Sequence, residues 1–271
     1  MELKESVAIV TGSARGIGRG IALTLAAQGA NLVIADLFHS PRHSPGYKLS
    51  GEEEVNKVVS EIKEMGRRAI GVDTDVTRSE TLTKMVERVT SEFGRIDILV
   101  NNAGIITRGP VAEFSEEAWD AIMSVNVKGV FLCSKAVIPT MVGQKRGKIV
   151  NIASIAGKRG GPNSAAYCAS KFAVIGLTQS LAQELAPHNI TANAVCPGSL
   201  YTAMWTEVLL PPIMAQRNLS AEEAFQRRAE ESIPLGRPQT PEDIGHAVVY
   251  FCQADNVTGT SLIVAGGSVM S

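Results

Sequence analysis

The chain has 271 residues, of which 45% are hydrophobic and 20% charged, and its formal net charge at pH 7 is −1. This composition is typical of a globular protein, and the near-neutral charge argues against nucleic acid or an anionic membrane surface as a partner. No leader-like pattern opens the chain and no apolar run reaches about 18 residues, so we expect a cytoplasmic protein without a membrane span. Because α/β folds often reach this length as one domain, we expect residues 1–271 to form one domain.

The cysteines argue against the commonest metal and redox sites. Cys133, Cys168, Cys196 and Cys252 are scattered singly, with no Cys-x-x-Cys pair and no histidine at ligand spacing. We therefore expect neither a bound metal nor a disulfide. Cys168 adjoins a candidate catalytic tyrosine, but packing against a strand is the simpler role for its small side chain.

The first elements are predicted to be a strand, a glycine turn and a helix. Residues 7–10 are apolar and β-branched, as in a strand that is buried on both faces of a parallel sheet. A helix is expected from residue 16 to a stop at Gly29. The turn between them suits a pyrophosphate, because glycines let the backbone approach closely and the helix N-terminus presents free amides. The residues expected to contact a dinucleotide here are Gly12, Ser13, Arg15, Gly16, Ile17 and Gly18.

An acid, Asp36, ends the second predicted strand, residues 31–36. Its carboxylate can accept hydrogen bonds from the ribose 2′-hydroxyl of an adenosine and would repel a 2′-phosphate. NAD is therefore favoured over NADP, with a strand-end cap as the alternative role for this acid. Residues 37–51 follow as a polar, proline-punctuated segment, far longer than the roughly two to six residues usual between a strand and a helix. We interpret this segment as an insertion loop.

Strands and helices keep alternating through the rest of the chain. Helices separate the further strands, which are predicted at residues 69–72, 96–100, 148–152, 190–195 and 261–264. The helix after the insertion loop is expected to begin with a capping box, Ser50-x-x-Glu53, and two later helices with Ser115 and Thr240 as N-caps. This alternation predicts an α/β fold, a doubly wound Rossmann-type sheet of seven parallel strands with helices on both faces. Ligands of such sheets bind at the carboxyl ends of the strands.

A proton-transfer unit is predicted just after the fifth strand. Tyr167 and Lys171 are four residues apart on a predicted helix, which places the phenol and the ammonium on one face. The cation stabilises the phenolate, so that the phenol can exchange protons nearer to neutral pH. Ser154 lies in the turn after the strand, where its hydroxyl can hydrogen-bond a substrate oxygen beside the phenol. For the Tyr-x-x-x-Lys spacing taken alone, chance occurrence in a helix is the alternative.

These residues belong to a longer series of motifs that follow one another in a fixed order. The series comprises TGSARGIG at residues 11–18, NNAG at residues 101–104, Asn126, the Ser154, Tyr167 and Lys171 set, and Pro197-Gly198. It resembles the classical short-chain dehydrogenase/reductase family, and the resemblance covers nearly the whole chain. The resemblance implies NAD(P)-dependent oxidation of an alcohol, or reduction of its ketone, without a metal.

The resemblance also implies roles that the spacing alone does not explain. Asn126 would hold a water that links Lys171 to solvent, and Lys171 would bind the ribose as well as lower the phenol pKa. A basic residue at position 15 is frequent among the NADP-preferring members of the family. Arg15 therefore opposes the preference for NAD that Asp36 indicates. The expected adenosine-side contacts are Asp75, Val76, Asn102, Ala103 and Gly104, and those expected beside the nicotinamide are Pro197, Gly198, Leu200 and Thr202.

The same resemblance implies a substrate lid over residues 199–235 and a homotetramer built on the long helices and the C-terminal strand region. In the lid, Thr202-x-Met204-Trp205 is similar to members that act on small diols and sugar alcohols, with Met204 and Trp205 as an apolar wall. A small diol, polyol or sugar alcohol is therefore favoured as the substrate. The alternatives are a 3-oxoacyl thioester and a Trp205 that only anchors the lid. The rival of another class, a non-catalytic dinucleotide-binding sensor, is disfavoured because Asn126 and the other three catalytic residues are all present.

Overall fold

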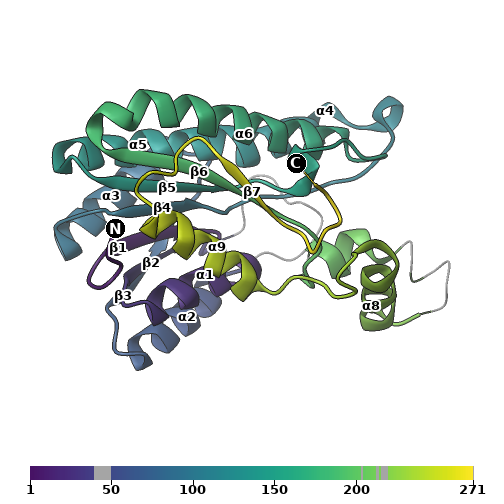
Figure 1. Cartoon of the computed structure of the whole chain (residues 1–271), viewed down its shortest axis with the longest axis horizontal. Coiled ribbons are helices and arrows are strands. Elements are labelled where there is room, and N and C mark those ends of the chain that lie inside the picture. The colour runs from purple at the N-terminus through teal and green to yellow at the C-terminus, as the bar shows by residue number, and fades with distance from the viewer. Residues whose placement is uncertain (40–49, 203, 212–213, 215–218, 271) are drawn as a thin grey trace.

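A seven-stranded parallel β-sheet organises the computed structural model, which describes residues 1–39, 50–202, 204–211, 214 and 219–270 (Figure 1). The strands lie side by side in the order β3-β2-β1-β4-β5-β6-β7. In chain order they are β1 Val7–Thr11, β2 Asn31–Asp36, β3 Ala69–Asp73, β4 Ile98–Asn101, β5 Gly147–Ile152, β6 Ile190–Pro197 and β7 Ser261–Val264. The order reverses between β1 and β4, and ligands of such sheets bind outside the strands' carboxyl ends at that point.

Strand register brings the predicted motifs to the same edge of the sheet. Thr11 at the end of β1 pairs with Ala35 of β2, so that the glycine turn and Asp36 leave the sheet together. On the other side, Asn101 at the end of β4 pairs with Asn151 of β5. The two strand-end motifs that follow, NNAG and the Ser154 turn, therefore open beside each other.

Two helical layers cover the sheet (Figure 1). One core joins the strands to α1 Gly16–Ala27, α2 Glu52–Glu64 and α9 Pro241–Gln253. The core on the other face joins them to α3 Ser79–Phe93, α5 Gly129–Gln144 and α6 Ala165–Leu185. Successive strand residues point to opposite faces, so Ala8 and Val10 enter the first core while Val7 and Ile9 enter the second. Burial on both sides explains why the strands are apolar at nearly every position.

Glycines let α1 and α9 pack closely against each other. A Cβ atom at Gly20 of α1 would overlap Pro241, and one at Gly245 of α9 would overlap the side chain of Thr24. The N-terminus of α9 is held by Thr240, whose hydroxyl accepts a hydrogen bond from the Asp243 amide at 3.2 Å. The glycine contacts fix the distance between the two helices. They therefore also fix the position of α1, whose N-terminus faces the site.

A single long helix carries the predicted Asn126. It consists of α4 Glu116–Met123, the π-helical turn Ser124–Lys128 and α5, which together span 29 residues. By length and composition this helix is apolar enough to cross a membrane. It packs against β4, β5, α3 and α6, and a helix that covers a sheet is apolar for that reason.

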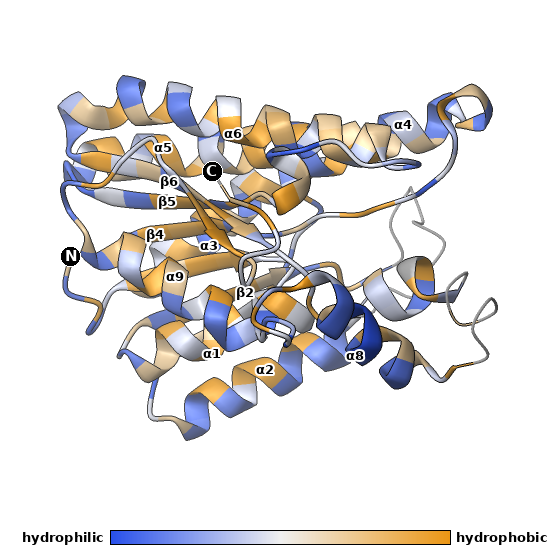
Figure 2. Ribbon diagram, turned by 45° about the vertical axis from the view of Figure 1, so that its right-hand side comes forward, coloured by the Kyte–Doolittle hydropathy of each residue, from blue (hydrophilic) through white to orange (hydrophobic). Residues whose placement is uncertain are grey.

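The predicted lid contains two described helical segments, Trp205–Leu209 and α8 Ala221–Ser232. They lie beyond the carboxyl ends of the strands, with α8 at the edge of the molecule (Figure 1). Figure 2 shows that hydrophobic residues gather on the strands and on the sides of the helices that face them, whereas α8 is largely hydrophilic. The lid has its own small apolar cluster, formed by Leu210, Ala224 and Phe225 with Trp205 packed against them.

The predicted fold class is confirmed, with shifts at some element ends. The helix after the insertion loop has Gly51 rather than Ser50 as its N-cap, and the Gly51 amide donates to Glu54 rather than Glu53, at 2.9 Å. The capping-box prediction was therefore wrong by one residue, because the spacing pattern also fits the next acid in the Glu52–Glu54 run. Of the predicted insertion loop, residues 40–49 lie outside the described part of the chain.

Candidate active site

The glycine turn after β1 is tied to the NNAG motif after β4. Asn102 donates from Nδ2 to the carbonyls of Thr11 and Gly12, at 2.9 and 2.8 Å, and its own amide donates to Thr11 Oγ1 at 3.0 Å. A Cβ atom at Gly18 would overlap the Gly12 carbonyl, and Gly12 itself has a positive φ of 63°. The turn thus needs glycine at both positions, and its open backbone fits the pyrophosphate of a dinucleotide at the N-terminus of α1.

The two acids predicted on the adenosine side line the same cavity as the glycine turn. Asp36 accepts one backbone N–H on each oxygen, from Ala14 and from Leu37, both at 2.8 Å. Burial raises the pKa of Asp36 above its ordinary value, although these hydrogen bonds and the charge of Arg15 oppose the shift. Asp75 is oriented by Thr77, which donates its amide at 2.9 Å and its hydroxyl at 2.6 Å to Oδ1.

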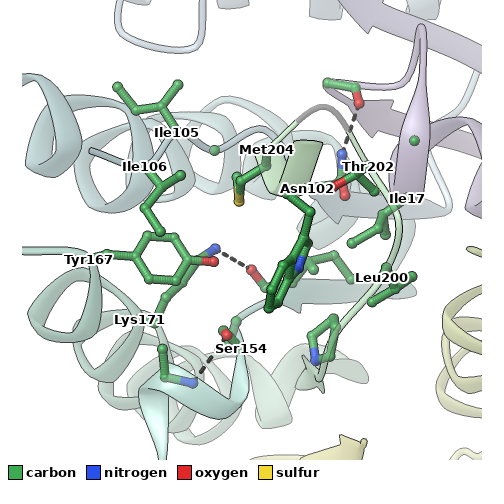
Figure 3. Close-up of a pocket in the computed structure, with 18 of the residues that line it drawn as sticks. Ile17, Asn102, Ile105, Ile106, Ser154, Tyr167, Lys171, Leu200, Thr202 and Met204 are labelled. Carbon is green, nitrogen blue, oxygen red and sulfur yellow. Dashed lines mark hydrogen bonds between the residues drawn. The ribbon is translucent and has the colours of Figure 1, made fainter. Parts of the chain in front are cut away.

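Tyr167 and Lys171 lie on α6 and Ser154 lies in the turn after β5, and all three face the cavity (Figure 3). Lys171 Nζ is 5.6 Å from the centroid of the Tyr167 ring and donates to the Ile152 carbonyl at 2.8 Å. The lysine is 4% exposed, and burial lowers its pKa to about 8. Ser154 Oγ accepts a hydrogen bond from the Ala156 amide at 3.1 Å, which leaves its hydroxyl proton for another acceptor.

Asn126 lies in the π-helical turn and is fully buried. Its Oδ1 accepts from the Ile105 amide at 2.8 Å, and its Nδ2 donates to the Ile105 carbonyl at 2.9 Å and to Ser170 Oγ at 3.1 Å. Ser170 in turn donates to the carbonyl of Tyr167 at 2.7 Å. The Asn126 side chain therefore connects the segment after β4 to the helix that carries Tyr167. Single π-turns inside α-helices are frequent at functional sites.

The residues predicted beside the nicotinamide follow β6. The Gly198 amide donates to the Val264 carbonyl of β7 at 2.9 Å, and a Cβ at Gly198 would overlap the Gln239 side chain. Leu200 and Thr202 continue along the cavity toward the glycine turn, where a Cβ at Gly16 would lie 3.6 Å from Thr202 Cγ2 (Figure 3). This segment thus closes the side of the cavity opposite Tyr167.

A single cavity of about 1040 Å³ brings nearly all of the predicted site together. Its lining includes every predicted catalytic, cofactor and substrate residue except Ser13 and Asn126. Ser13 is fully buried, and its hydroxyl donates to the Val10 carbonyl at 2.7 Å. It therefore stabilises the glycine turn without lining the cavity. Met204 and Trp205, the residues predicted to form an apolar wall, line the cavity, and Met204 faces Ile106 and Tyr167 in Figure 3.

The structure adds lining residues that sequence reasoning missed. Ile105, Ile106 and Arg108 come from the segment after NNAG, Arg159 from the loop after Ser154, and Arg228 and Ser232 from α8. The first four follow strand ends, and this position could have predicted them, because the residues after parallel strands gather at one edge of the sheet. The predicted substrate lid, residues 199–235, includes α8, but the sequence pattern singles out neither Arg228 nor Ser232 within it. Within the described ranges no group of three or more His, Cys, Asp or Glu side chains is arranged to hold a metal.

Comparison with known proteins agrees with this geometry. The family model for short chain dehydrogenase matches residues 6–211. The chain is 39% identical over 269 residues to the (2S)-[(R)-hydroxy(phenyl)methyl]succinyl-CoA dehydrogenase subunit BbsD of Thauera aromatica, covering 98% of both chains. It is 35% identical over 272 residues to the 3-oxoacyl-[acyl-carrier-protein] reductase of Thermotoga maritima, covering 100% of each. A third relative, a 3-oxoacyl-[acyl-carrier-protein] reductase of Synechocystis, is 38% identical over 271 residues, covering 99% of this chain and 98% of its own.

A solved structure is also similar over the whole molecule. Carveol dehydrogenase from Mycobacterium avium in complex with NAD has a TM-score of 0.91 and 31% identity, covering 98% of each chain. With a family model over residues 6–211 and relatives that cover nearly its full length, this chain belongs to the short-chain dehydrogenase family of NAD(P)-dependent oxidoreductases.

Proposed function

We propose that the protein is an NAD-dependent dehydrogenase that interconverts a secondary alcohol and its ketone. The observation that carries this proposal is that Ser154, Tyr167 and Lys171 line the same cavity as the glycine turn. An alcohol held at Ser154 and a dinucleotide held along the turn would share one space, and hydride transfer needs that direct contact.

In the direction of oxidation, bound NAD⁺ supplies the acceptor for the hydride that leaves the carbinol carbon. Tyr167 takes the hydroxyl proton, so that the C–H electron pair leaves as hydride while the O–H pair forms the carbonyl bond. Ser154 donates its hydroxyl proton to the substrate oxygen, because its acceptor side already holds the Ala156 amide. Lys171, whose Nζ lies 5.6 Å from the centroid of the Tyr167 ring, stabilises the phenolate, and Asn126 supports the proton path from Lys171 toward solvent.

NAD rather than NADP is the cofactor that Asp36 favours. Each of its carboxylate oxygens accepts one backbone N–H and keeps room for a second donor, such as a ribose hydroxyl. A 2′-phosphate would meet this half-buried anion instead. Arg15 lines the same end of the cavity and offers the opposing charge. The NAD bound in the carveol dehydrogenase structure is in keeping with this preference.

For the substrate, a 3-hydroxyacyl or 3-oxoacyl thioester has the stronger support. Three of the relatives carry names that specify CoA or acyl-carrier-protein thioesters. In addition, Trp205 packs edge-on against Phe225, with ring centroids 5.4 Å apart, as expected of a residue that anchors the lid. A small diol or polyol is the second candidate, because Met204 and Trp205 also line the cavity as the diol hypothesis requires.

The two candidates are separated by a rate comparison on purified protein, followed by nicotinamide absorbance with both cofactors. We expect faster reduction of acetoacetyl-CoA than oxidation of butane-2,3-diol or sorbitol. Robust oxidation of a diol without thioester reduction would instead assign the diol, and Trp205→Ala should then lower kcat/KM for it. If NAD binds but no alcohol or ketone is turned over, the result contradicts the dehydrogenase function and favours the non-catalytic sensor.

A further inference from the structure

A buried glutamine, Gln239, lies where the segments after β6 and β7 meet the start of α9. It directly precedes Thr240, the N-cap of α9, and only 7% of it is exposed. Its amide donates to the Ser199 carbonyl at 3.1 Å. Ser199 lines the cavity, whereas Gln239 does not. The glutamine therefore contacts the segment expected beside the nicotinamide from outside the cavity.

The side chain of Gln239 fills the space between two glycines. A Cβ atom at Gly198, after β6, would overlap its Oε1, and a Cβ at Gly266, after β7, would lie 3.1 Å from its Nε2. The Cβ at Gly198 would also lie 2.9 Å from the Ala265 Cβ atom. Because protein interiors are close-packed, a side chain in such contact fixes the position of the backbone that it touches. Gln239 thus supports Gly198 on the side away from the cavity.

The contact between Gln239 and Gly198 is one of shape. Among the described residues, Oε1 of Gln239 has no hydrogen-bond partner, and an unpaired buried acceptor lowers stability. An apolar side chain of the same length would avoid that loss. Methionine has nearly the length of glutamine, and it can therefore replace Gln239 without breaking a hydrogen bond of Oε1.

The packing of α9 on α1 sets the position of Gln239. Thr240 accepts a hydrogen bond from the first turn of α9, and the next residue, Pro241, is the one that a Cβ at Gly20 of α1 would overlap. The N-terminus of α1 follows the glycine turn that fits the pyrophosphate. One pair of helices therefore locates the pyrophosphate end of the site and, through Gln239, its nicotinamide side.

The same glutamine joins the two ends of the predicted lid. Ser199 begins that segment, and Gln239 follows its end at residue 235. The returning chain is also held at the loop after β7, where the Leu235 amide donates to the Gly266 carbonyl at 3.1 Å. Both ends of the lid segment thus start from one base directly behind Gly198.

We propose that Gln239 is a positioning residue, which holds Gly198 and Ser199 where the nicotinamide end of the cofactor binds. This inference rests on the proposed function, since it takes the nicotinamide to lie beside residues 197–202. Gln239 acts on the cofactor only through the backbone that it supports. Loss of its side chain therefore weakens binding of the nicotinamide end and leaves binding of the adenosine diphosphate end unchanged.

The test compares two ligands that share the adenosine diphosphate end. NADH carries a nicotinamide and ADP-ribose does not, and each is titrated by calorimetry into the whole protein. Gln239→Ala empties the space between the two glycines, and Gln239→Met fills it again without the amide. Gln144→Ala is the control, because Gln144 is half-buried and binds Ile96 through hydrogen bonds of 3.0 and 2.7 Å, outside the cavity lining.

We expect Gln239→Ala to weaken NADH binding by about tenfold and ADP-ribose binding by less than about twofold. Gln239→Met should recover most of the NADH affinity and should melt no lower than the wild type, because Oε1 has no partner to lose. Gln144→Ala should lower the Tm without changing the ratio of the two affinities. Gln239→Asn, shorter by one methylene, should change the ratio in the same direction as alanine, and it replaces the alanine variant if that variant does not fold.

Several results would overturn the positioning role. These are equal losses for the two ligands, no loss for either, the same change of ratio in Gln144→Ala, or a Gln239→Met variant that binds NADH as weakly as Gln239→Ala. A wild type that binds NADH no more tightly than ADP-ribose would overturn it as well.

The binding measurement keeps this inference separate from the proposed function, because it needs no turnover. A changed ratio in a protein that turns over no alcohol or ketone supports the role of Gln239 and contradicts only the dehydrogenase function. Turnover with an unchanged ratio leaves the dehydrogenase function intact and overturns the role of Gln239.

Discussion

Tyr167 is the residue on which the proposed chemistry depends most directly. Its phenol is the proton carrier, whereas the remainder of its ring only occupies space beside Lys171, 5.6 Å from Nζ. We expect Tyr167→Phe to fold and to bind NAD but to lose more than nine-tenths of the turnover, because only the transferable proton is removed. Steady-state rates and NAD titrations check this, with Tyr201→Phe, a second tyrosine of the cavity lining, as the control. Turnover above about a tenth of the wild-type rate would refute the assignment.

Lys171 gives the protein a stability that depends on pH. Burial lowers its pKa from 10.5 to about 8, so at neutral pH the native state holds a charged ammonium at a cost. Between about pH 8 and 10.5 the unfolded chain binds more protons than the native state, and stability therefore rises with pH, by about 3 kcal/mol at most. Below pH 8 both states are protonated and this contribution is flat.

Lys171→Met removes the titration while keeping an apolar side chain of similar length. We expect the Tm of the wild type minus that of Lys171→Met to increase from pH 7 to pH 10. Thermal melts at several pH values measure this difference, and other titrating groups cancel because both proteins share them. A difference that stays constant over this range would mean that the ammonium is not desolvated in the native state.

Asp36 sets the cofactor preference through its charge. Asp36→Asn removes the charge at nearly constant shape, so the repulsion of a 2′-phosphate disappears while the positive charge of Arg15 remains. We expect the ratio of kcat/KM with NADP to that with NAD to rise about tenfold or more. Asp75→Asn, the other acid of the cavity lining, should leave the ratio nearly unchanged. If the wild type already prefers NADP, Arg15 outweighs Asp36.

At the scale of elements, the contact between α1 and α9 is as tight as glycine allows. Gly245→Ala places a methyl group onto Thr24, and such overpacking costs about 1–3 kcal/mol. Gly176 of α6 is the control, because a Cβ there meets nothing within 4 Å, and an alanine should add up to about 1 kcal/mol of helix stability. Urea unfolding should move the two midpoints in opposite directions. A shift of Gly245→Ala toward greater stability would show that the helices separate without cost.

A second pair of elements is joined by the buried Lys148 of β5. Its Nζ donates to Asp255, after α9, at 2.8 Å, and to the Ala254 carbonyl at 3.1 Å. Mainly because of the Lys148 hydrogen bond, the pKa of Asp255 is lowered to about 2. This contribution to stability is present above the ordinary pKa of 3.8 and is lost as the pH falls through about 2. Since Asp255 is largely exposed, the bond contributes little at neutral pH.

At the scale of the whole molecule, large apolar side chains lie exposed on the long helices. Trp119 of α4, Phe131 of α5 and Phe172 of α6 are 40%, 47% and 48% exposed. They lie on the helices that the expected homotetramer would pack together. We expect the wild type to be a tetramer by light scattering, and Phe172→Asp to shift it to smaller species because a charge would be buried in the interface. Met65→Asp, at the exposed end of α2, should leave the tetramer intact, whereas a monomeric wild type would contradict the prediction.

The sequence alone determined those features that depend on residues close together in the chain. The sheet was predicted because residues 7–10 and most positions of the other strands are apolar, which follows from burial on both faces. The glycine turn was predicted because positive φ and close backbone approach leave glycine as the residue that fits. Tyr167 and Lys171 were brought together by helical periodicity, a property of five consecutive residues.

Only the tertiary structure decided which distant segments meet. The spacing of the residues does not show that Asn126 binds Ile105 and Ser170, since these partners lie in other segments and Asn126 itself lies in a π-helical turn. Nor does the sequence place the guanidinium of Arg228 over the ring of Trp205. Contacts between segments far apart follow from how helices pack onto the sheet, and packing depends on the shape of the whole core.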